Sequence, residues 1–364
     1  MGITRSTLHT PALYCYIIIL LAIGLWPFNF WQKNNADLDS LYGLIISPPG
    51  TVYTPVPPAK IATIEKFTIL LHLSSDFAGS NGYGRILTYS RDEKHMNFMI
   101  GQWKKSLVFK VHTDAKAKPI HFETDAVFNA GERTWIALVY DGTRLHLYQN
   151  GIRKGAKRTG PLVFSQWDTS FPLVIGSDAH GRFHWKGKIS TLAIFDRSFP
   201  QRKIRDVTRS IGDYAPLVHY TFKKASGTRV KDEGTGTSGN LMVPFRYRPY
   251  KRVVLGSPST AFNDYRRDLR DILLNLAGFI PFGLLMMLSL TRRGIKTGTA
   301  LFISLAAGFG LSLVIEMIQP FLSSRTSSTT DLINNTLGTT LGALGYAVTR
   351  SRSAFLRNYN IRQR

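Results

Sequence analysis

The sequence has little cysteine and few acidic residues. Its single cysteine, Cys15, lies in an apolar run, so the chain cannot form an intrachain disulfide. The 23 Asp and Glu are outnumbered by 46 Lys and Arg, which gives a formal net charge of +23. The apolar runs also lack the Ser/His/Asp, Cys/His and His-rich sets of common hydrolases and metal enzymes. These absences argue against the common hydrolytic mechanisms, and the charge favours anionic partners.

Hydrophobic and charged residues separate along the chain. Both ends are apolar and the middle is polar, which predicts a two-part protein. Between Thr51 and Tyr250 the chain has 30 Lys and Arg against 16 Asp and Glu. Such a basic region suits nucleic acid if it is cytoplasmic, and anionic lipid headgroups or envelope glycans if it lies outside. A charge excess that only keeps the domain soluble is the simpler alternative.

Near the start of the chain, an apolar run extends from Pro11 to Phe30. The aromatic sequence WPFNFW lies at its end. A cleaved signal peptide is one interpretation, but no small-x-small cleavage site follows the run. Aromatic residues at its end are typical of the belt that anchors a transmembrane helix at the membrane surface. We therefore predict a retained transmembrane helix within residues 1–30. A linker over residues 31–58 follows it, because this segment contains SPPG and TPVPPAK.

Three further apolar segments of membrane-span length lie within residues 268–348. The basic TRRGIK loop between the first two is predicted to lie in the cytoplasm by the positive-inside rule. Together with the first helix, these segments predict a four-helix transmembrane bundle. Both termini are then cytoplasmic, including a basic tail over residues 349–364, and the polar middle of the chain lies outside the cytoplasm.

Strongly polar residues interrupt these apolar segments. On the predicted topology they fall at the outer ends of the helices. Asp271 with Asn275 and Asp331 with Asn335 are i,i+4 pairs, and Glu316 with Gln319 is an i,i+3 pair, so the two members of each pair share one helix face. Charged residues inside a membrane are expensive and often mark a functional site. We predict that one polar cluster binds a ligand under the outer surface, with a loop arginine as counter-ion. The cluster consists of Asp271, Asn275, Glu316, Gln319, Arg325, Asp331 and Asn335.

Two other interpretations of this cluster stay open. Asp271 and Asp331 could cap helices while the amides join neighbouring helices, which is a purely structural role. Glu316 or Asp331 could instead be the general base of a membrane-embedded enzyme that acts on a lipid or glycan precursor at the outer interface. Gly338 and Gly342 also form a Gly-x-x-x-Gly pair, which predicts close packing of the last helix.

The same stretch resembles the VanZ-like family of small membrane proteins. The resemblance covers about residues 11–30 and 268–348. The motifs that carry it are Asn275 with Pro281, Phe282 and Gly283, then Glu316 with Gln319, then Asp331 with Asn335 and Gly338. The family is named from glycopeptide-antibiotic resistance clusters, so the resemblance implies a bacterial envelope role without specifying a reaction. The long polar insert departs from the family's compact form.

After the linker, the pattern changes to an alternation of apolar and polar residues. Runs such as FTILLHLSS (67–75) and KISTLAIFDRSF (188–199) predict β-strands separated by turns. The Asp-Gly pair at 141–142, between two such runs, predicts a tight hairpin. We predict an all-β antiparallel sandwich over residues 59–245. A basic linker over residues 246–267 joins it to the membrane part.

The second half of the predicted sandwich carries another resemblance. TWIALVYDGTRLHLYQNG (134–151) and WKGKISTLAIFDRSF (185–199) are similar to the laminin-G-like or concanavalin A-like jelly roll. Residues 217–241 resemble the opening strand and loop of that fold, and either close the sandwich or are the remnant of a second copy. Lectins, adhesive modules and glycan hydrolases all occur in this superfamily, so the resemblance does not select one function.

The sandwich is expected to bind rather than to catalyse. The glucanases of this fold use a Glu-x-Asp-x-Glu strand, and only the fragment Glu-Thr-Asp at 123–125 occurs here. We expect no cofactor, and a Ca²⁺ ion on the lectin-like domain stays open. Asp76, Asp141 and Asp178 lie in or beside loops, but a Ca²⁺ site needs about six to eight oxygen ligands, and the sequence does not identify the full set. The tryptophans that could stack on sugar rings, or belong to the core, are Trp103, Trp135, Trp167 and Trp185.

These patterns predict a multi-domain protein that combines a VanZ-like four-helix transmembrane bundle with a concanavalin A-like jelly roll. We expect a multi-pass protein of the bacterial inner membrane that displays a carbohydrate- or ligand-binding domain outside the cytoplasm. Its expected role is cell-envelope recognition, or antibiotic or stress resistance. The expected partners are membrane lipid and an envelope glycan or anionic lipid headgroup, and not nucleic acid. The alternative is the membrane-embedded enzyme with Glu316 or Asp331.

Overall fold

The computed structural model describes residues 9–76, 83–91, 95–112, 119–164, 167–236, 239–256 and 265–362, without the side chains of 9–10, 265–268 and 354–362. The chain divides into two compact units. The sandwich unit is Trp31–Arg252, and the helical unit combines Met1–Phe30 with Val253–Arg364.

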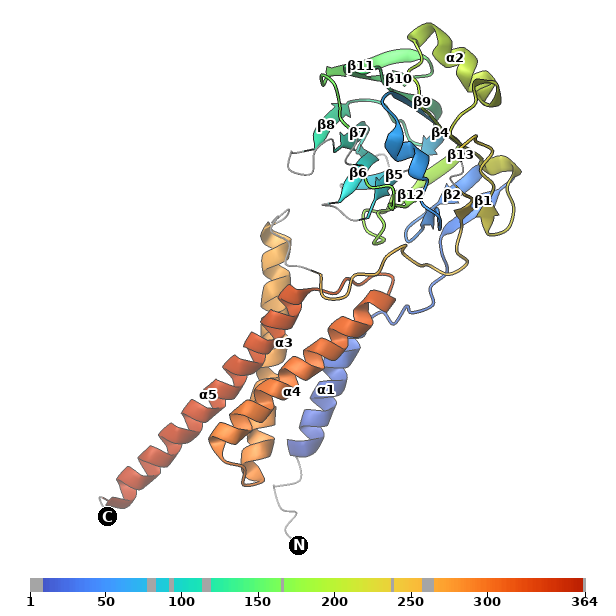
Figure 1. The fold of residues 1–364 in the computed structure, drawn as a ribbon. Helices are drawn as coiled ribbons and strands as arrows, with labels where there is room; N and C mark the ends of the chain where they lie inside the picture. The colour runs from blue at the N-terminus through green and yellow to red at the C-terminus, as the bar shows by residue number, and fades with distance from the viewer. Residues whose placement is uncertain are drawn as a thin grey trace. The chain divides into compact units, whose positions relative to one another are not determined.

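Two antiparallel sheets form the sandwich unit, each with eight strands (Figure 1). The first sheet has the order β1-β2-β13-β4-β9-β10-β11, with β14 paired to β13. Its strands are β1 (Ala36–Asp39), β2 (Gly43–Ile46), β4 (Phe67–Ser75), β9 (Arg133–Tyr140), β10 (Arg144–Gln149), β11 (Ile152–Arg158), β13 (Gly187–Phe195) and β14 (Val218–Thr221).

The second sheet has the order β15-β16-β3-β12-β5-β6-β7-β8. Its strands are β3 (Val52–Tyr53), β5 (Tyr83–Ser90), β6 (Met96–Trp103), β7 (Ser106–Val111), β8 (Ile120–Thr124), β12 (Leu173–Ile175), β15 (Arg229–Val230) and β16 (Leu241–Met242). The predicted all-β antiparallel sandwich is therefore confirmed.

The core of the sandwich unit lies between the two sheets. Alternate side chains of each strand point inward, so Ile69 and Leu71 of β4 belong to the same buried cluster as Phe98 of β6. Trp185 is fully buried, and its indole N–H donates to Gln102 Oε1 over 2.8 Å. Burying one such apolar side chain contributes about 1.5–3 kcal/mol, so this core is the main source of the unit's stability.

Helix α2 (Gln201–Arg209) covers part of the outer face of the first sheet. Its apolar residues Ile204 and Val207 are three positions apart, so they share one helix face and pack on Ala137 and Val139 of β9. Figure 1 shows α2 beside the region of β9 to β11. The remaining face of the helix stays exposed, and most of its residues there are basic.

The hairpin of β9 and β10 turns where the Asp-Gly pair predicts it. The N–H of Asp141 donates to the carbonyl of Arg144 over 3.1 Å. Gly142 adopts a positive φ of 107°, a conformation that glycine reaches without strain. The turn is tightened by Asp141 Oδ1, which accepts the N–H groups of Thr143 (2.9 Å) and Arg144 (2.8 Å).

The prediction of a linker over residues 31–58 is wrong. Strands β1, β2 and β3 lie in this segment, and they pair within the two sheets: β2 with β13, and β3 with β12. The proline-rich sequences fall in the connections beside these strands. Because the strands are very short and flanked by proline, the sequence pattern did not indicate them. The sandwich unit therefore begins at Trp31.

The C-terminal part of the sandwich unit completes the fold. Strand β14 pairs with β13, and the β15–β16 hairpin joins the second sheet through β3. Residues 217–241 thus close the sandwich and are not the remnant of a second copy. The unit continues to Arg252, so the predicted boundary at residue 245 is too early. Residues 257–264 and the side chains of Arg266 and Arg267, which belong to the predicted basic linker, lie outside the described residues.

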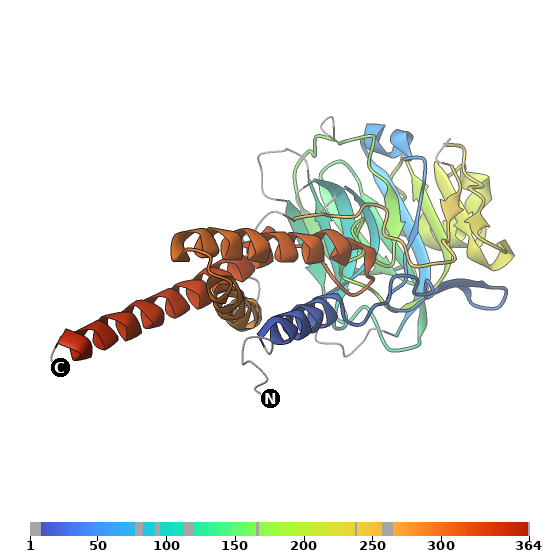
Figure 2. The same ribbon diagram turned by 90° about the horizontal axis from the view of Figure 1, so that it is seen from below.

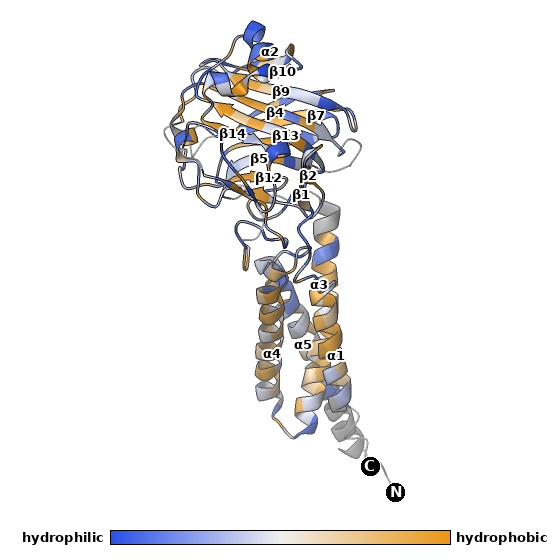
Figure 3. Ribbon diagram, turned by 90° about the vertical axis from the view of Figure 1, so that its right-hand side faces the viewer, coloured by the Kyte–Doolittle hydropathy of each residue, from blue (hydrophilic) through white to orange (hydrophobic). Residues whose placement is uncertain are grey.

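The described part of the helical unit contains four α-helices: α1 (His9–Leu25), α3 (Tyr265–Arg292), α4 (Thr297–Ile318) and α5 (Thr329–Arg362). Among the described residues, Leu269–Arg292 and Thr297–Phe321 are long and apolar enough to cross a membrane. The apolar stretch of α1, Pro11–Leu25, is shorter. Figure 3 shows hydrophobic residues along α1, α3 and α4. A helical unit with two helices of span length is therefore established, and the bundle with four spans stays a prediction.

Small residues let α3 and α5 pack with their backbones in contact. A Cβ atom at Gly342 would collide with the carbonyl oxygen of Ile280, and one at Gly338 would collide with the carbonyl oxygen of Leu276. Only glycine fits these two positions of α5. The close contact that the Gly-x-x-x-Gly pair predicts is therefore present in the structure.

Helix α5 continues through the residues predicted to form a separate tail. It ends at Arg362, so most of residues 349–364 extend the last helix. In Figures 1 and 2 its C-terminal half projects beyond the other helices of the unit. The boundary at residue 348 reflects the end of the apolar sequence and does not coincide with the end of the helix.

Candidate functional site

A cavity of about 610 Å³ lies among the helices of the helical unit. Its volume falls within the range of about 300–1,000 Å³ that is usual for ligand sites. Residues of α1, α3, α4, α5 and the α4–α5 loop line it, and we call it the polar cavity. All seven residues of the predicted cluster line the polar cavity: Asp271, Asn275, Glu316, Gln319, Arg325, Asp331 and Asn335. The structure brings these residues together, and their role in binding stays a prediction.

The carboxylates of the polar cavity lie near helix ends. Asp331 is in the first turn of α5, and the side chain of Asn275 hydrogen-bonds to it. Glu316 lies in the last turn of α4 and is 1% exposed. Its Oε2 accepts the backbone N–H of Ser328 over 2.7 Å, just before α5 begins. One oxygen of Glu316 therefore supports the start of α5, which agrees with the structural interpretation for that atom.

The hydrogen-bond donors around the cavity are already engaged. Gln319 Nε2 donates to the carbonyl of Gly24 over 3.0 Å, and Asn335 Nδ2 donates to Ser312 Oγ over 2.9 Å. Arg325 donates from Nε and Nη2 to two carbonyls at the end of α1, those of Trp26 (2.9 Å) and Ile23 (3.0 Å). Arg325 thus caps α1 and contributes positive charge to the cavity without forming an ion pair with a carboxylate of the cluster among the described contacts.

Two oxygen atoms of the cluster have no hydrogen-bond partner among the described residues. They are Gln319 Oε1 and Asn335 Oδ1, on side chains that are 7% and 4% exposed. A buried acceptor without a donor costs about 1–3 kcal/mol. The orientation of the Gln319 amide is fixed by the network, because only its nitrogen can donate to the carbonyl of Gly24. Both oxygens are therefore places where a ligand could supply a hydrogen bond.

The enzyme alternative needs a general base in the polar cavity. Oε2 of Glu316 already accepts a backbone N–H, which leaves Oε1 of Glu316 and the carboxylate of Asp331 for that role. The residues that line the polar cavity include no cysteine, histidine or lysine, and their hydroxyl groups belong to Tyr16, Ser324 and Thr326. The set of groups suits recognition of a polar ligand better than covalent catalysis.

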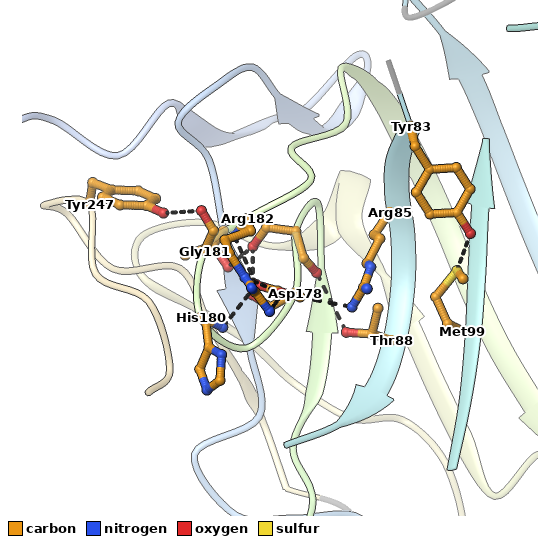
Figure 4. Close-up of polar contacts among 11 residues, drawn as sticks. Tyr83, Arg85, Thr88, Met99, Asp178, His180, Gly181, Arg182 and Tyr247 are labelled. Atoms are coloured by element: carbon orange, nitrogen blue, oxygen red, sulfur yellow. Dashed lines mark hydrogen bonds and ion pairs between the residues drawn. The ribbon is translucent and has the colours of Figure 1, made fainter. Parts of the chain in front are cut away.

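A second polar cluster lies in the sandwich unit, where Asp178 is fully buried (Figure 4). Its Oδ1 accepts the N–H groups of His180 (3.0 Å) and Arg182 (2.7 Å). Its Oδ2 accepts Nε of Arg182 over 3.1 Å and lies 3.8 Å from Nη1 of Arg85, which is 5% exposed. This buried carboxylate is well supplied with donors and positive charge, as a structural ion pair requires.

The loop that carries Asp178 is held in place by the C-terminal segment of the sandwich unit. The hydroxyl of Tyr247 donates to the carbonyl of Gly181 over 3.0 Å, and the N–H of Lys251 donates to the carbonyl of Ala179 over 2.8 Å. Burial raises the pKa of Tyr247, so its hydroxyl keeps the proton that it donates. We therefore interpret this cluster as a structural clamp.

The four tryptophans proposed as sugar platforms differ in exposure. Trp167 and Trp185 belong to the buried core. Trp103 is 39% exposed, with Nζ of Lys104 at 5.7 Å from its ring centre. The half-buried Trp135 stacks on His72, with ring centres 4.5 Å apart. Only Trp103 and Trp135 of this set present ring surface to a ligand.

No group of three His, Cys, Asp or Glu residues in the described part of the chain could hold a metal ion. The loop aspartates Asp76, Asp141 and Asp178 therefore do not form a Ca²⁺ site together. The carboxylate of Asp178 is surrounded by arginines, and that of Asp141 by the N–H groups of its turn. A Ca²⁺ ion on this domain would need other ligands.

A basic surface on the sandwich unit was missed from the sequence. It consists of the exposed basic residues of strand β11 and helix α2, and the only acidic residue in these two elements is Asp206. The two elements meet at Gly151, whose carbonyl accepts Nε2 of Gln201 over 3.4 Å. We call this the basic edge surface; its residues are Arg153, Lys154, Lys157, Arg158, Arg202, Lys203, Arg205 and Arg209. The IRKGAKR run could have indicated half of it, because a strand with charged residues on both faces is typical of a sheet edge.

Two family models match the chain. Residues 215–350 match VanZ/LLP1, and residues 50–205 match the concanavalin A-like lectin/glucanases superfamily. The first match begins inside the sandwich unit, which ends at Arg252. No curated protein matches the chain.

Solved structures with similar folds cover about half of the chain. One is the Ruminococcus gnavus IT-sialidase CBM40, with 12% identity, a TM-score of 0.38, and coverage of 46% of this chain and 96% of that one. Another is a heptameric SAP-like pentraxin from Limulus polyphemus, with 14% identity, a TM-score of 0.36 and coverage of 57% and 94%. The NanB sialidase of Streptococcus pneumoniae has 14% identity and a TM-score of 0.37, with coverage of 48% of this chain and 27% of that one.

Proposed function

We propose that this chain is a bacterial membrane protein that displays a glycan-binding sandwich. The ground for this is that it contains a VanZ-like domain and a concanavalin A-like domain. The helical unit crosses the inner membrane with α1, α3, α4 and α5. Both termini and the loop with Arg292 and Lys296 face the cytoplasm, where positive loop charge is favoured. The sandwich unit lies outside the cytoplasm and acts in cell-envelope recognition or in antibiotic or stress resistance.

The observation that carries this proposal is the basic edge surface. Eight exposed cationic side chains on two adjacent elements create a positive field that attracts anions and is weakened by salt. Protection of the sheet edge explains the charges of β11, since charged residues prevent edge strands from pairing with other chains. It does not explain the charges of α2, which is not at a sheet edge. We therefore infer an anionic partner.

The partner that fits is an acidic envelope glycan, with carboxylate or phosphate groups along a polymer. Arginine suits both groups because its guanidinium forms paired hydrogen bonds to two oxygens. A long polymer can contact β11 and α2 at once, so many weak ion pairs of about 0.2–1 kcal/mol each add up. Nucleic acid would need a cytoplasmic sandwich, which the proposed topology does not provide.

The test is binding by the full chain in nanodiscs of uncharged lipid. Polygalacturonate, a carboxylated polysaccharide, should bind and should dissociate as salt is raised, and neutral dextran should not bind. Neutralising two residues of α2, Arg205→Gln with Arg209→Gln, should weaken binding about fivefold. The matched control neutralises two exposed lysines elsewhere on the same unit, Lys60→Gln with Lys231→Gln, and should leave binding unchanged.

Equal binding of dextran, or equal effects of the two double variants, would contradict this function. The first result would remove the role of charge, and the second would remove the role of the basic edge surface.

A further inference from the structure

The polar cavity has more acidic than basic groups. Its ionisable residues include three carboxyl groups, of Asp271, Glu316 and Asp331, and one guanidinium, of Arg325. Arg325 donates two N–H groups to carbonyl groups of α1, and no described hydrogen bond or ion pair joins it to these carboxyl groups. The cluster therefore has an excess of acidic groups and of acceptors, which is costly at membrane depth when the groups ionise.

The amide groups add to this excess of acceptors. Gln319 and Asn335 direct their nitrogen atoms to protein oxygens and leave Oε1 and Oδ1 without a partner. These two buried oxygens are independent of the carboxylates, and they need the same thing, an N–H or O–H donor. An anionic headgroup would add negative charge beside the carboxyl groups, so it suits the site poorly.

The arrangement also argues against a bare metal ion. The three carboxylates of the polar cavity do not form a group that could hold a metal among the described residues. A cation that binds through N–H donors does not need a closed set of carboxylates and can also use amide oxygens. A primary ammonium group has three N–H donors and a full positive charge, so it fits both the carboxylates and the amide oxygens.

Part of the cavity lining is apolar. It includes Ile19, Leu20 and Ile23 of α1 and Leu274 of α3, and the side chains of Ile19, Ile23 and Leu274 are exposed in the helical unit. An occupant whose ammonium group binds the acceptors can therefore place hydrocarbon on these residues. The lining as a whole suits an amphiphile.

We propose that the polar cavity binds the primary ammonium headgroup of a membrane amphiphile. The ammonium group donates to Asp331 and to the free oxygens of Gln319 and Asn335, and the hydrocarbon lies along α1. The inference rests on the proposed membrane insertion of the helical unit, but not on glycan binding by the sandwich unit.

The test is native mass spectrometry of the full chain in detergent with three lipids that share the same acyl chains. Phosphatidylethanolamine carries a primary ammonium, phosphatidylcholine carries a cation without N–H donors, and phosphatidylglycerol is anionic. Phosphatidylethanolamine should be retained about tenfold more than the other two, a difference of about 1.4 kcal/mol, because only its ammonium group donates hydrogen bonds to the acceptors of the cavity. Ethanolamine at the same concentration should not displace it, because it lacks the hydrocarbon.

Variants connect the preference to the site. Asp331→Asn keeps the side-chain shape and should remove the preference, whereas Asp331→Glu keeps the charge and should retain most of it. If Asp331→Asn does not fold, judged by its unfolding temperature, Gln319→Met replaces it, because this change removes the free oxygen Oε1 and keeps the length of the side chain. The same loss of preference is expected for Gln319→Met, and an unchanged preference there counts as an unchanged preference in the Asn variant. Equal retention of the three lipids, retention of none, displacement by ethanolamine, or an unchanged preference in the Asn variant would each overturn the proposal. Polygalacturonate binding would be unaffected by any of these outcomes, so the proposed function can stand or fall separately.

Discussion

Two buried polar clusters of this protein, one in each unit, differ in how their oxygen atoms are satisfied. In the sandwich unit, the fully buried Asp178 accepts N–H groups from two residues and lies beside two arginines. In the helical unit, the buried amides of Gln319 and Asn335 each leave one oxygen without a partner among the described residues, and both residues line a cavity. Both oxygens of the Asp178 carboxylate have partners within the protein, and the two amide oxygens would gain theirs from a ligand. This difference separates a structural cluster from a candidate site.

The largest effect is expected where the polar cluster is complete. Asp178→Ala leaves the buried guanidinium of Arg85 without its carboxylate, which should lower the free energy of unfolding by about 3–5 kcal/mol. The matched control is Asp196→Ala, which removes an exposed carboxylate paired with Arg197 at 3.0 Å and should cost less than about 1 kcal/mol. Urea unfolding followed by tryptophan fluorescence measures both. Similar losses in the two variants would show that the Asp178 cluster is not a structural clamp.

A smaller loss is expected where the helical unit depends on backbone contact. Gly342→Ala puts a Cβ atom against the carbonyl of Ile280 and should lower stability by about 1–3 kcal/mol, the usual cost of overpacking. Gly345→Ala is the control on the same helix, because a Cβ atom there meets nothing within 4 Å. The unfolding temperature in detergent should fall for the first variant and stay or rise for the second. If the unfolding temperature fell by the same amount in Gly345→Ala, the loss would come from the flexibility of the helix and not from the α3–α5 contact.

The smallest effect is expected at an exposed acidic turn of the sandwich. Burial raises the pKa of Asp141, but hydrogen bonds from His146 and from the turn outweigh it and lower the pKa from 3.8 to about 2. The ionised form therefore stabilises the folded state above pH 4, and this contribution is lost as the pH falls towards 2. Because the side chain is 37% exposed, we expect about 1 kcal/mol or less.

Asp141→Asn should remove that part of the acid dependence, measured as the difference between the unfolding free energies at pH 7 and pH 3. Asp213→Asn, at another exposed position of the unit, should leave the difference unchanged. A difference that persists in Asp141→Asn would mean that other carboxylates account for it.

The sequence predicted the fold best where local patterns were long. Period-two runs such as 67–75 became β4, and the Asp-Gly pair marked the turn of β9 and β10. Strands β1, β2 and β3 have two to four residues, too short to show a period, and their pairing depends on distant partners in β12 and β13. Such pairing is set by tertiary contacts that no local pattern records.

The residues of the candidate site were predicted from the sequence, but the chemistry of the site was not. The predicted topology and the i,i+3 and i,i+4 spacing indicated that Asp271, Glu316 and Asp331 lie together, and in the structure all three line one cavity. No sequence pattern indicated that Arg325 would bind the end of α1, because these contacts join residues about 300 positions apart. The carbonyl contacts of Arg325, together with the unpartnered oxygens of Gln319 and Asn335, turned the expectation of an unspecified ligand in this cluster into the proposal of an ammonium group. The basic residues of α2 could likewise not be assigned to a surface from the sequence. Their position beside β11 follows only from the fold.

The account depends most directly on the membrane topology, and single-cysteine labelling of intact cells tests it. Cys15→Ser removes the native thiol, and Lys154→Cys in the sandwich unit or Arg293→Cys between α3 and α4 then introduces one exposed thiol. A membrane-impermeant maleimide should label the cysteine at position 154 in intact cells, and the cysteine at position 293 only after permeabilisation. Labelling at position 293 in intact cells, or protection at position 154, would contradict the displayed sandwich and with it the proposed binding of an envelope glycan.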